Sequence, residues 1–325
     1  MIYIAVLIIL FGLELVYFKI ADRFNIIDKP NERSSHSEIT LRGGGIIFYF
    51  AVVLYFIRSD FAYPWFFAGL TMMTLISFLD DIFTLSNKIR LIVHFTSVLL
   101  MSYQLALFEM PWYILLLGFI CVVGVINAYN FMDGINGITA GYSLAVTALL
   151  IIVNNSIYFI DNNLLLFTML GLIVFAFFNF RNRAKCFAGD VGSVAIAFIL
   201  LFGLGSLIIH TGNFIYILFL LIYGLDAVWT IVQRLLRREN IFKAHRSHLY
   251  QYLVNEVGRN KLLVSLTYSI LQLIIGLLTI YFSSKSIEIQ LIYSIATLIF
   301  GSVIYLLLKS TIYKNFVLKT SSSSL

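Results

Sequence analysis

The chain has 325 residues, of which 61% are hydrophobic and only 12% are charged. A soluble domain has roughly 25% charged residues, so this composition and a mean hydropathy of +0.95 exclude a soluble globular protein and predict an integral membrane protein. The formal net charge of +6 does not indicate a nucleic-acid partner, because the basic residues are spread over several loops and membrane topology explains them.

The first apolar run follows Met1 directly, without a basic leader or a small-residue cleavage site, which favours a spanning helix over a signal peptide. A helix needs about 20 apolar residues to cross a bilayer. Apolar runs near this length, the second of them short, predict an all-α polytopic protein with about eleven spans. They lie at residues 2–20, 43–57, 61–79, 91–108, 111–128, 135–153, 164–180, 191–210, 213–233, 262–282 and 288–308.

An odd number of spans places the two termini on opposite sides of the membrane. With the N terminus outside, only Arg58 and Lys285 of the 22 Lys and Arg residues lie on the outer side. Because positive residues concentrate in cytoplasmic loops, we expect the C terminus to be cytoplasmic. We expect one membrane-embedded domain over residues 1–310 and a short cytoplasmic tail over residues 311–325. The inner loops are then residues 21–42, 80–90, 129–136, 181–190 and 234–261.

The first two inner loops combine cations, glycines and carboxylates. Lys29, Arg33 and Arg42 supply cationic donors, and the run of three glycines from Gly43 permits close approach to a ligand or to a neighbouring helix. Asp80 and Asp81 end an apolar run, where two adjacent carboxylates repel each other and favour a bound cation. Mg²⁺ suits such oxygen ligands together with substrate phosphates. A solvated loop and a simple helix cap are the plainer alternatives.

The third and fourth inner loops are rich in amides and glycines. The third carries Asn127, Asn130, Asp133 and Asn136, and asparagine offers the uncharged donors and acceptors that base or sugar recognition requires. The fourth reads Phe187-Ala188-Gly189-Asp190-Val191-Gly192-Ser193 at the start of the next span. Asp190 and Ser193 either cap that helix, or Asp190 holds a metal that bridges phosphates at the helix start.

The last inner loop contains His245-Arg246-Ser247-His248, whose members could bind a metal, contact phosphates or shuttle protons. We disfavour zinc, since no Cys or further His lies nearby to complete its site. Asp226 falls inside an apolar run. An intramembrane carboxylate is either functional or paired with an arginine from a neighbouring helix.

Taken in order, these motifs resemble the polyprenyl-phosphate N-acetylhexosamine-1-phosphate transferases of glycosyltransferase family 4. The resemblance spans about residues 1–310 and rests on Asp28-Lys29-Pro30, Arg33, His36, Gly43-Gly44-Gly45, Asp80-Asp81, the Asn127–Gly137 loop, Phe187–Ser193 and His245–His248. The family implies that undecaprenyl phosphate attacks the sugar-bound phosphorus of a UDP-N-acetyl sugar in the presence of Mg²⁺, or alternatively Mn²⁺, and that UMP leaves. The family also implies that the protein lies in the bacterial inner membrane, and some members of the family form homodimers.

The resemblance implies roles by motif position. Asp190 is the principal Mg²⁺ ligand, and Asp80 and Asp81 are catalytic, one accepting a proton from the lipid phosphate or helping to hold Mg²⁺. Phe187 takes the position that stacks on uracil. His245 and His248 join the catalytic residues as contacts to the diphosphate, and Asp81 joins Asp190 as a metal ligand. The remaining roles are contacts to nucleotide, metal shell or phosphates, and they fall on Lys29, Arg33, Asn127, Asn130, Asp133, Asn136 and Arg246.

Three departures bear on the substrate. Thr40-Leu41-Arg42 replaces the proline that often precedes the glycine run in the family, and Asn136 replaces an aspartate of the peptidoglycan branch. The His245–His248 sequence replaces that branch's histidine-rich triplet. The pattern is more similar to the O-antigen and capsule branch, whose donors include UDP-linked 6-deoxy amino sugars, UDP-GlcNAc and UDP-GalNAc. A membrane transporter for a cation or a phosphorylated solute is the rival reading, although few charges lie within the spans.

Overall fold

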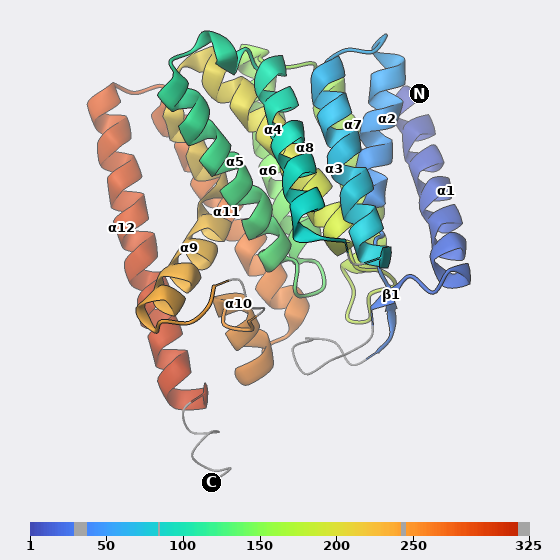
Figure 1. Cartoon of the computed structure of the whole chain (residues 1–325). Helices are drawn as coiled ribbons and strands as arrows, with labels where there is room; N and C mark the ends of the chain where they lie inside the picture. Colours follow the sequence, from blue (N-terminus) through green and yellow to red (C-terminus); the bar gives the residue numbers. More distant parts are fainter. Residues whose placement is uncertain (29–37, 84, 242–244, 318–325) are drawn as a thin grey trace.

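A computed structural model describes residues 1–28, 38–83, 85–241 and 245–317. Helices account for nearly all of it, which confirms the all-α class (Figure 1). The long helices are α1 (Ile2–Arg23), α2 (Ile46–Arg58), α3 (Pro64–Phe83), α4 (Asn87–Gln104), α5 (Trp112–Met132), α6 (Ile138–Ile157), α7 (Asn162–Asn179), α8 (Gly189–Thr211), α9 (Leu221–Leu236), α11 (Lys261–Ser283) and α12 (Ile287–Ile312).

Short elements join these helices. They are the antiparallel ribbon of β1 (Ile27–Asp28) and β2 (Thr40–Leu41), the turn α10 (Leu249–Gln251), and the short helical segments η1 (Leu107–Glu109), η2 (Phe214–Leu220), η3 (Tyr252–Glu256) and η4 (Tyr313–Val317). Each of the apolar runs found in the sequence lies largely on one helix, with η2 and α9 together forming the ninth.

Nine of the helical stretches in the described chain are long and apolar enough to cross a membrane, which confirms a multi-pass membrane protein. The two exceptions have physical causes. Helix α2 has 13 residues, and at about 1.5 Å per residue it is shorter than a bilayer core of about 30 Å. Helix α4 carries Lys88, Arg90 and His94 in its first turns. The number of eleven crossings therefore stays a prediction.

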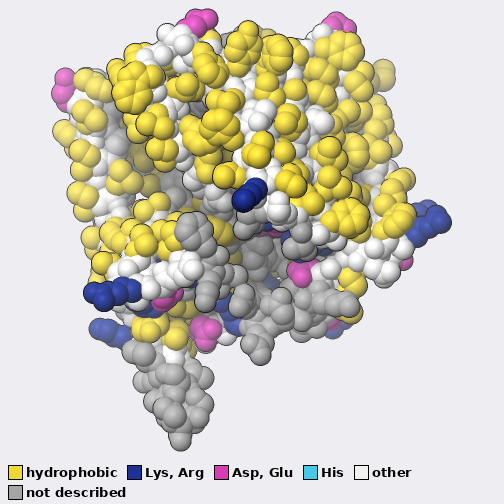
Figure 2. All heavy atoms as spheres, in the orientation of Figure 1, with side chains coloured by type: hydrophobic (Ala, Val, Ile, Leu, Met, Phe, Trp, Pro, Cys, Tyr) yellow, Lys and Arg dark blue, Asp and Glu magenta, His cyan; other side chains and the backbone are white. Residues whose placement is uncertain are grey.

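The helices run roughly along one axis, and the start of α1 and the end of α12 lie at opposite ends of the bundle (Figure 1). We call the end where α1, α3, α5, α7 and α9 finish the polar end. Lys and Arg side chains lie toward that end, Asp and Glu side chains occur at both ends, and hydrophobic side chains cover most of the surface between them (Figure 2). Helix α8 lies at the centre, with 78% of its most apolar stretch buried, and it packs on α2, α3, α5 and α6. Functional loops at the polar end are thus fixed to a buried helix.

Asp226 on α9 is buried at 1% exposure and accepts hydrogen bonds from several elements. The Tyr268 hydroxyl on α11 donates at 2.7 Å, the Tyr305 hydroxyl on α12 donates at 3.0 Å, and His248 Nδ1 lies 3.2 Å away. The backbone N–H of Leu249 also donates, at 3.0 Å. Asp226 therefore joins three helices to the loop that follows His248. We name this group the Asp226 cluster.

A lysine completes the charge balance of the Asp226 cluster. Lys309 on α12 is 3% exposed, and its Nζ donates to Thr230 Oγ1 at 2.7 Å and to the Tyr305 hydroxyl at 2.8 Å. Both hydroxyls in turn contact the Asp226 carboxylate. Of the two alternatives for Asp226, the arginine partner is wrong. Its partners are a histidine, two tyrosines, a threonine and the N–H groups of Leu249 and Tyr250, with a lysine one hydrogen bond away.

We expect Asp226→Ala to destabilise the fold by about 3–5 kcal/mol, because removing one member of a buried charge network leaves Lys309 uncompensated. Tyr268→Phe, which removes one hydrogen bond to the same carboxylate, should cost only about 1 kcal/mol. Thermal unfolding of the purified variants in detergent measures both. Equal melting temperatures for Asp226→Ala and the wild type would contradict this account of the cluster.

Candidate functional site

The glycine run brings the starts of two helices into backbone contact. A Cβ built on Gly192, in the first turn of α8, would lie 2.5 Å from the Cα of Gly45, which precedes α2. The N–H of Gly44 donates to the carbonyl of Phe187 at 2.9 Å. The glycines therefore serve the approach of a neighbouring helix, one of the two uses predicted for them.

The carboxylate of Asp81 caps the first turn of α8. Its side chain has no solvent exposure, and it accepts hydrogen bonds from the N–H groups of Asp190 at 3.4 Å and Val191 at 3.2 Å. The Arg42 guanidinium lies 2.7 Å from the Asp81 carboxylate and 3.1 Å from the Asp190 carboxylate. Arg42 thus joins two like charges that would otherwise repel each other.

The helix cap at α8 differs from the one considered in the sequence. Ser193 donates its hydroxyl to the carbonyls of Gly189 and Asp190, within its own helix. The Asp190 side chain turns to Arg42. Because the carboxylate of Asp81, from α3, caps the helix instead, the reading of Asp190 as a self-cap is wrong. Asp190 is left 27% exposed beside the pocket described next.

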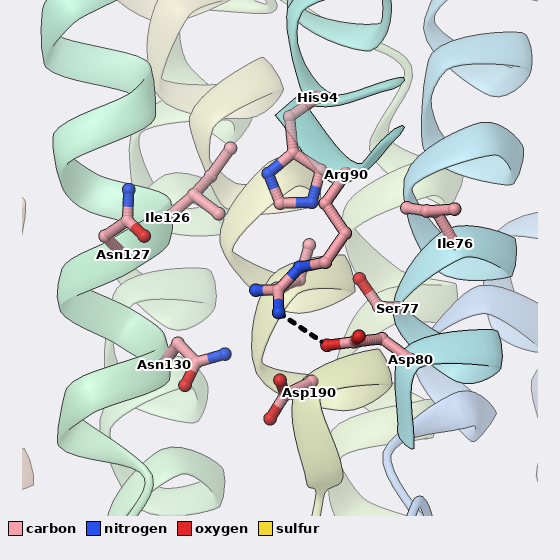
Figure 3. Close-up of a pocket in the computed structure, with 10 residues that line it drawn as sticks. Ile76, Ser77, Asp80, Arg90, His94, Ile126, Asn127, Asn130 and Asp190 are labelled. Atoms are coloured by element: carbon pink, nitrogen blue, oxygen red, sulfur yellow. Dashed lines mark ion pairs between the residues drawn. The ribbon is translucent and has the colours of Figure 1, made fainter. Parts of the chain in front are cut away.

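A small polar pocket opens between α3, α4, α5 and α8 (Figure 3). Asp80, Arg90, Asn130 and Asp190 face it, each from a different helix. The Asp80 carboxylate pairs with Arg90 at 2.6 Å and accepts the N–H of Leu85 at 2.8 Å. Ile76, Ser77, His94, Ile126, Asn127 and Val194 complete the lining. The sequence-predicted Asp80, Asn127, Asn130 and Asp190 thus meet at one point.

The donor set of this pocket suits Mg²⁺. Asp80 and Asp190 offer carboxylate oxygens and Asn130 an amide oxygen, and Mg²⁺ usually takes one or two carboxylates with the rest of its shell from phosphates and water. In the part of the chain that the structure describes, no group of three His, Cys, Asp or Glu residues could hold a metal. A metal here would therefore depend on substrate oxygens. Asp81, also predicted as a ligand, lies beneath the pocket and not on its wall.

Residues of the third loop have two different roles: Asn127 and Asn130 line the pocket, and Asn136 connects loops. The amide of Asn136 is buried and donates to the carbonyls of Arg181 at 2.7 Å and Asn182 at 3.1 Å, so it ties the third loop to the fourth. Burial raises the pKa of the Asp133 carboxyl to about 6, and the hydroxyl of Thr139, which donates to it at 2.6 Å, opposes that rise. Asn136 has a connecting role here, and its predicted contact to nucleotide stays a prediction.

Phe187 is half-buried in the segment that leads into α8. Its N–H donates to the carbonyl of Leu41 in β2 at 2.8 Å. Because of this hydrogen bond, Arg42, the residue after β2, lies next to the start of α8. The backbone around Phe187 is therefore fixed, and its stacking on a base stays a prediction.

The two histidines of the last inner loop differ. His248 is 2% exposed and is held by Asp226, and its Nε2 has no hydrogen-bond partner among the described residues. His245 lies beside it, with ring centroids 4.9 Å apart, and both rings lie near Phe131, the residue after Asn130. Burial and the neighbouring His248 lower the pKa of His245 to about 4, so it is neutral at pH 7.

The remaining predicted residues lie elsewhere. Arg246 approaches Glu256 at 3.8 Å, and both side chains are 30% exposed. Lys29 and Arg33 lie outside the described residues. The sequence predicted Arg42 as a cationic donor, and the structure places its guanidinium between Asp81 and Asp190. No site role was predicted for Arg90 or His94, and the only signal for Arg90 was its place after Asp80-Asp81 on the same side of the membrane.

Comparison with known proteins agrees with this geometry. The model of the family described as "Glycosyl transferase family 4" matches residues 63–225, which is half of the chain. This stretch contains the two adjacent aspartates, the asparagine loop and the Phe187–Ser193 motif.

Named relatives extend the match. A probable undecaprenyl-phosphate N-acetylglucosaminyl 1-phosphate transferase of Bacillus subtilis is 26% identical over 73% of this chain and 72% of its own length. An undecaprenyl-phosphate alpha-N-acetylglucosaminyl 1-phosphate transferase of Thermotoga maritima is 28% identical over 83% of this chain and 87% of its own. An Escherichia coli protein of the same description is 30% identical over 59% and 58%. With the family match over half of its length and the four-helix pocket of carboxylates, the chain belongs to glycosyl transferase family 4, the polyprenyl-phosphate sugar-1-phosphate transferases.

Proposed function

We propose that this protein transfers an N-acetylhexosamine 1-phosphate, or a 6-deoxy amino sugar 1-phosphate, from a UDP-sugar to undecaprenyl phosphate. An oxygen of the lipid phosphate forms a bond to the sugar-bound phosphorus, the bond to the bridging oxygen breaks, and UMP leaves with that electron pair. The observation that carries the proposal is the convergence of Asp80, Asn130 and Asp190 on one pocket at the polar end.

We place this pocket at the cytoplasmic face of a bacterial inner membrane. The sequence predicts all but two of the 22 Lys and Arg residues for the inner side, and cytoplasmic loops are enriched in these residues. Helix α12 finishes at the polar end, and α1 begins at the other end of the bundle (Figure 1). A nucleotide sugar made in the cytoplasm would then meet a lipid phosphate at the same surface.

Mg²⁺ is the proposed cofactor, with Asp190 and Asp80 as its carboxylate ligands and Asn130 beside them. Bound there, it would neutralise charge on the phosphates of both substrates, which otherwise repel each other. Phosphoryl transfer depends mainly on positioning and on stabilising charge.

The chain's own residues do the positioning. Arg42 and Arg90 hold the pocket carboxylates from either side, at 3.1 Å and 2.6 Å. Asp80 is better placed than Asp81 to take a proton from the lipid phosphate, since it lines the pocket while Asp81 is enclosed by Arg42 and the α8 backbone. Neutral His245 can donate or accept a hydrogen bond near the end of α5.

An apolar cavity supports a lipid acceptor. It has a volume of about 710 Å³ and lies between α4, α5, α8 and η2. Its wall includes Val122 on α5 and Leu201 on α8, one and two helical turns beyond pocket residues Ile126 and Val194. The lipid phosphate would reach the pocket while part of its chain enters this cavity.

The donor is proposed from motif and relatives together. The His245–His248 sequence is similar to the O-antigen and capsule branch, which would place the reaction at the start of a lipid-linked glycan. The relatives are described as N-acetylglucosaminyl 1-phosphate transferases, so UDP-GlcNAc is the first donor to test.

We expect purified protein to release UMP when it is given undecaprenyl phosphate, Mg²⁺ and the correct UDP-sugar from a panel of N-acetyl sugars. Chelation of the metal with EDTA should abolish release, and added Mg²⁺ should restore it. The described pocket side chains are too few to hold the metal without substrate oxygens, and the substrate phosphates need the charge of the metal. Coupled detection of UMP makes the measurement. UMP release that is indifferent to the lipid or to EDTA would contradict the proposal.

Asp190→Asn should lower the rate of UMP release by at least about 100-fold, the size of effect seen when one electrostatic stabiliser of a transition state is removed. The matched control is Asp22→Asn, the same chemical change at an exposed position near the polar end of α1. Steady-state rates of the two variants at equal protein concentration decide the matter. A normal rate for a folded Asp190→Asn would overturn its role as a metal ligand.

The variants Asp80→Asn and Asp81→Asn should distinguish a residue that acts in the reaction from one that stabilises the fold. Both should lose activity, but Asp81→Asn should lower the melting temperature more, because the Asp81 side chain is fully buried between Arg42 and two backbone N–H groups, whereas Asp80 is 10% exposed at the pocket. Parallel rate and thermal unfolding measurements test this. An Asp81→Asn variant as stable as Asp80→Asn would argue against the buried carboxylate as a structural tie.

A further inference from the structure

A second cavity lies where α9 and α12 end at the polar end, apart from the pocket of Asp80 and Asp190. Its volume is about 110 Å³, several times the roughly 10–15 Å³ that one water molecule needs. Its lining consists of Gln233, Arg237, Tyr252, Lys309, Ser310, Tyr313 and Lys314. We call it the basic pocket, because three of these residues are cations and none is acidic.

Two cations of the basic pocket, Arg237 and Lys314, lie outside the Asp226 cluster, whereas Lys309 is linked to the Asp226 carboxylate through Thr230 and Tyr305. Among the ion pairs of the described residues, none involves Arg237, Lys309 or Lys314. The Arg237 guanidinium lies over the ring of Tyr313 at 4.6 Å, and Lys309 Nζ is 5.9 Å from the ring of Tyr252. Aromatic faces can orient cations in this way while leaving their N–H groups available to an anion.

Lys309 is the buried member of this set. Its ammonium has three donors, and two are used by Thr230 and Tyr305. The third is available to a ligand in the basic pocket. Asp226 balances the charge of Lys309. Arg237 and Lys314 add two further positive charges to the same cavity, and a bound anion would reduce their repulsion.

The position of the basic pocket points to a lipid. Helix α12 lies at the edge of the bundle (Figure 1), and only 6% of its most apolar stretch is buried. Ile304, Leu307 and Leu308 are exposed in the turns just before the basic pocket. An apolar surface that ends at a cluster of cations matches an acyl chain followed by a negatively charged headgroup.

We propose that the basic pocket binds the phosphate headgroup of an anionic membrane phospholipid, with its acyl chains along the exposed face of α12. This site shares no residue with the polar pocket of Asp80 and Asp190. It does not depend on the reaction proposed above. Inorganic phosphate offers the same headgroup chemistry without the chains, and so provides the comparison that tells the two sources apart.

The test uses the full chain in a non-ionic detergent, with phosphatidylglycerol, phosphatidylcholine or inorganic phosphate added. Native mass spectrometry measures retained lipid, and thermal unfolding measures stabilisation. The double variant Arg237→Gln/Lys314→Gln removes the two exposed cations and leaves Lys309 in the Asp226 cluster. Lys19→Gln/Arg23→Gln makes the same charge change near the polar end of α1, at the opposite edge of the bundle from α12 (Figure 1).

We expect phosphatidylglycerol to be retained by the wild type and to raise its melting temperature, and phosphatidylcholine to do neither. The Arg237→Gln/Lys314→Gln variant should retain phosphatidylglycerol about 30-fold more weakly, as expected for two cations lost at a membrane surface. The Lys19→Gln/Arg23→Gln control should behave as the wild type. If the basic-pocket variant is unstable, Lys314→Gln alone should still show weaker retention.

Two outcomes would overturn the proposal. Equal retention of phosphatidylglycerol by the wild type and the basic-pocket variant would show that the basic pocket is not the binding site. A rise in melting temperature with inorganic phosphate as large as that with phosphatidylglycerol, at the same concentration, would make the ligand a soluble anion and not a lipid.

Discussion

The carboxylate of Asp81 is shut off from solvent, and each polar group that it contacts comes from a distant part of the chain. Arg42 arrives from the ribbon before α2, and the N–H groups of Asp190 and Val191 come from the first turn of α8. A buried carboxylate is costly unless hydrogen bonds and an opposite charge replace its water. This one requirement fixes the end of α3 and the starts of α2 and α8 relative to each other, and so decides where Asp190 lies.

The same arrangement occurs again on the other side of the bundle. Asp226 on α9 is buried, accepts the N–H groups of Leu249 and Tyr250, and is balanced by a nearby cation, Lys309. In both places a carboxylate from one helix caps the start of another segment. Each capped segment carries a functional motif, Asp190 in one and His248 in the other. The polar end is therefore organised by two internal caps, and its loops are extensions of a rigid helical frame.

Much of this architecture could be predicted from the sequence. The apolar runs predicted the helices, because burial in a membrane requires long uninterrupted stretches of apolar residues. The motif loops predicted that Asp80, Asn130 and Asp190 would meet, because alternating spans return successive loops to one side. The orientation of the bundle rests on charge bias alone.

Pairings between distant residues could not be predicted. Arg42 contacts Asp190, 148 positions away, and no periodicity or spacing encodes such a contact. The sequence left two alternatives for Asp226, a functional role or pairing with an arginine. It did not predict the partners Tyr268 and Tyr305, because a hydropathy pattern assigns such tyrosines to lipid contact or packing. Likewise, nothing local distinguishes Asp80, which lines the pocket, from its neighbour Asp81, which lies beneath it.

The contact between Gly45 and Gly192 has a consequence for how substrates enter. At this crossing no side chain lies between the two backbones to absorb a shift, so the starts of α2 and α8 form a single wall. The opposite side is different, since only 11% of the most apolar stretch of α5 is buried. A lipid acceptor, as proposed above, would therefore reach the pocket from the side of α5, away from the wall that holds Asp190.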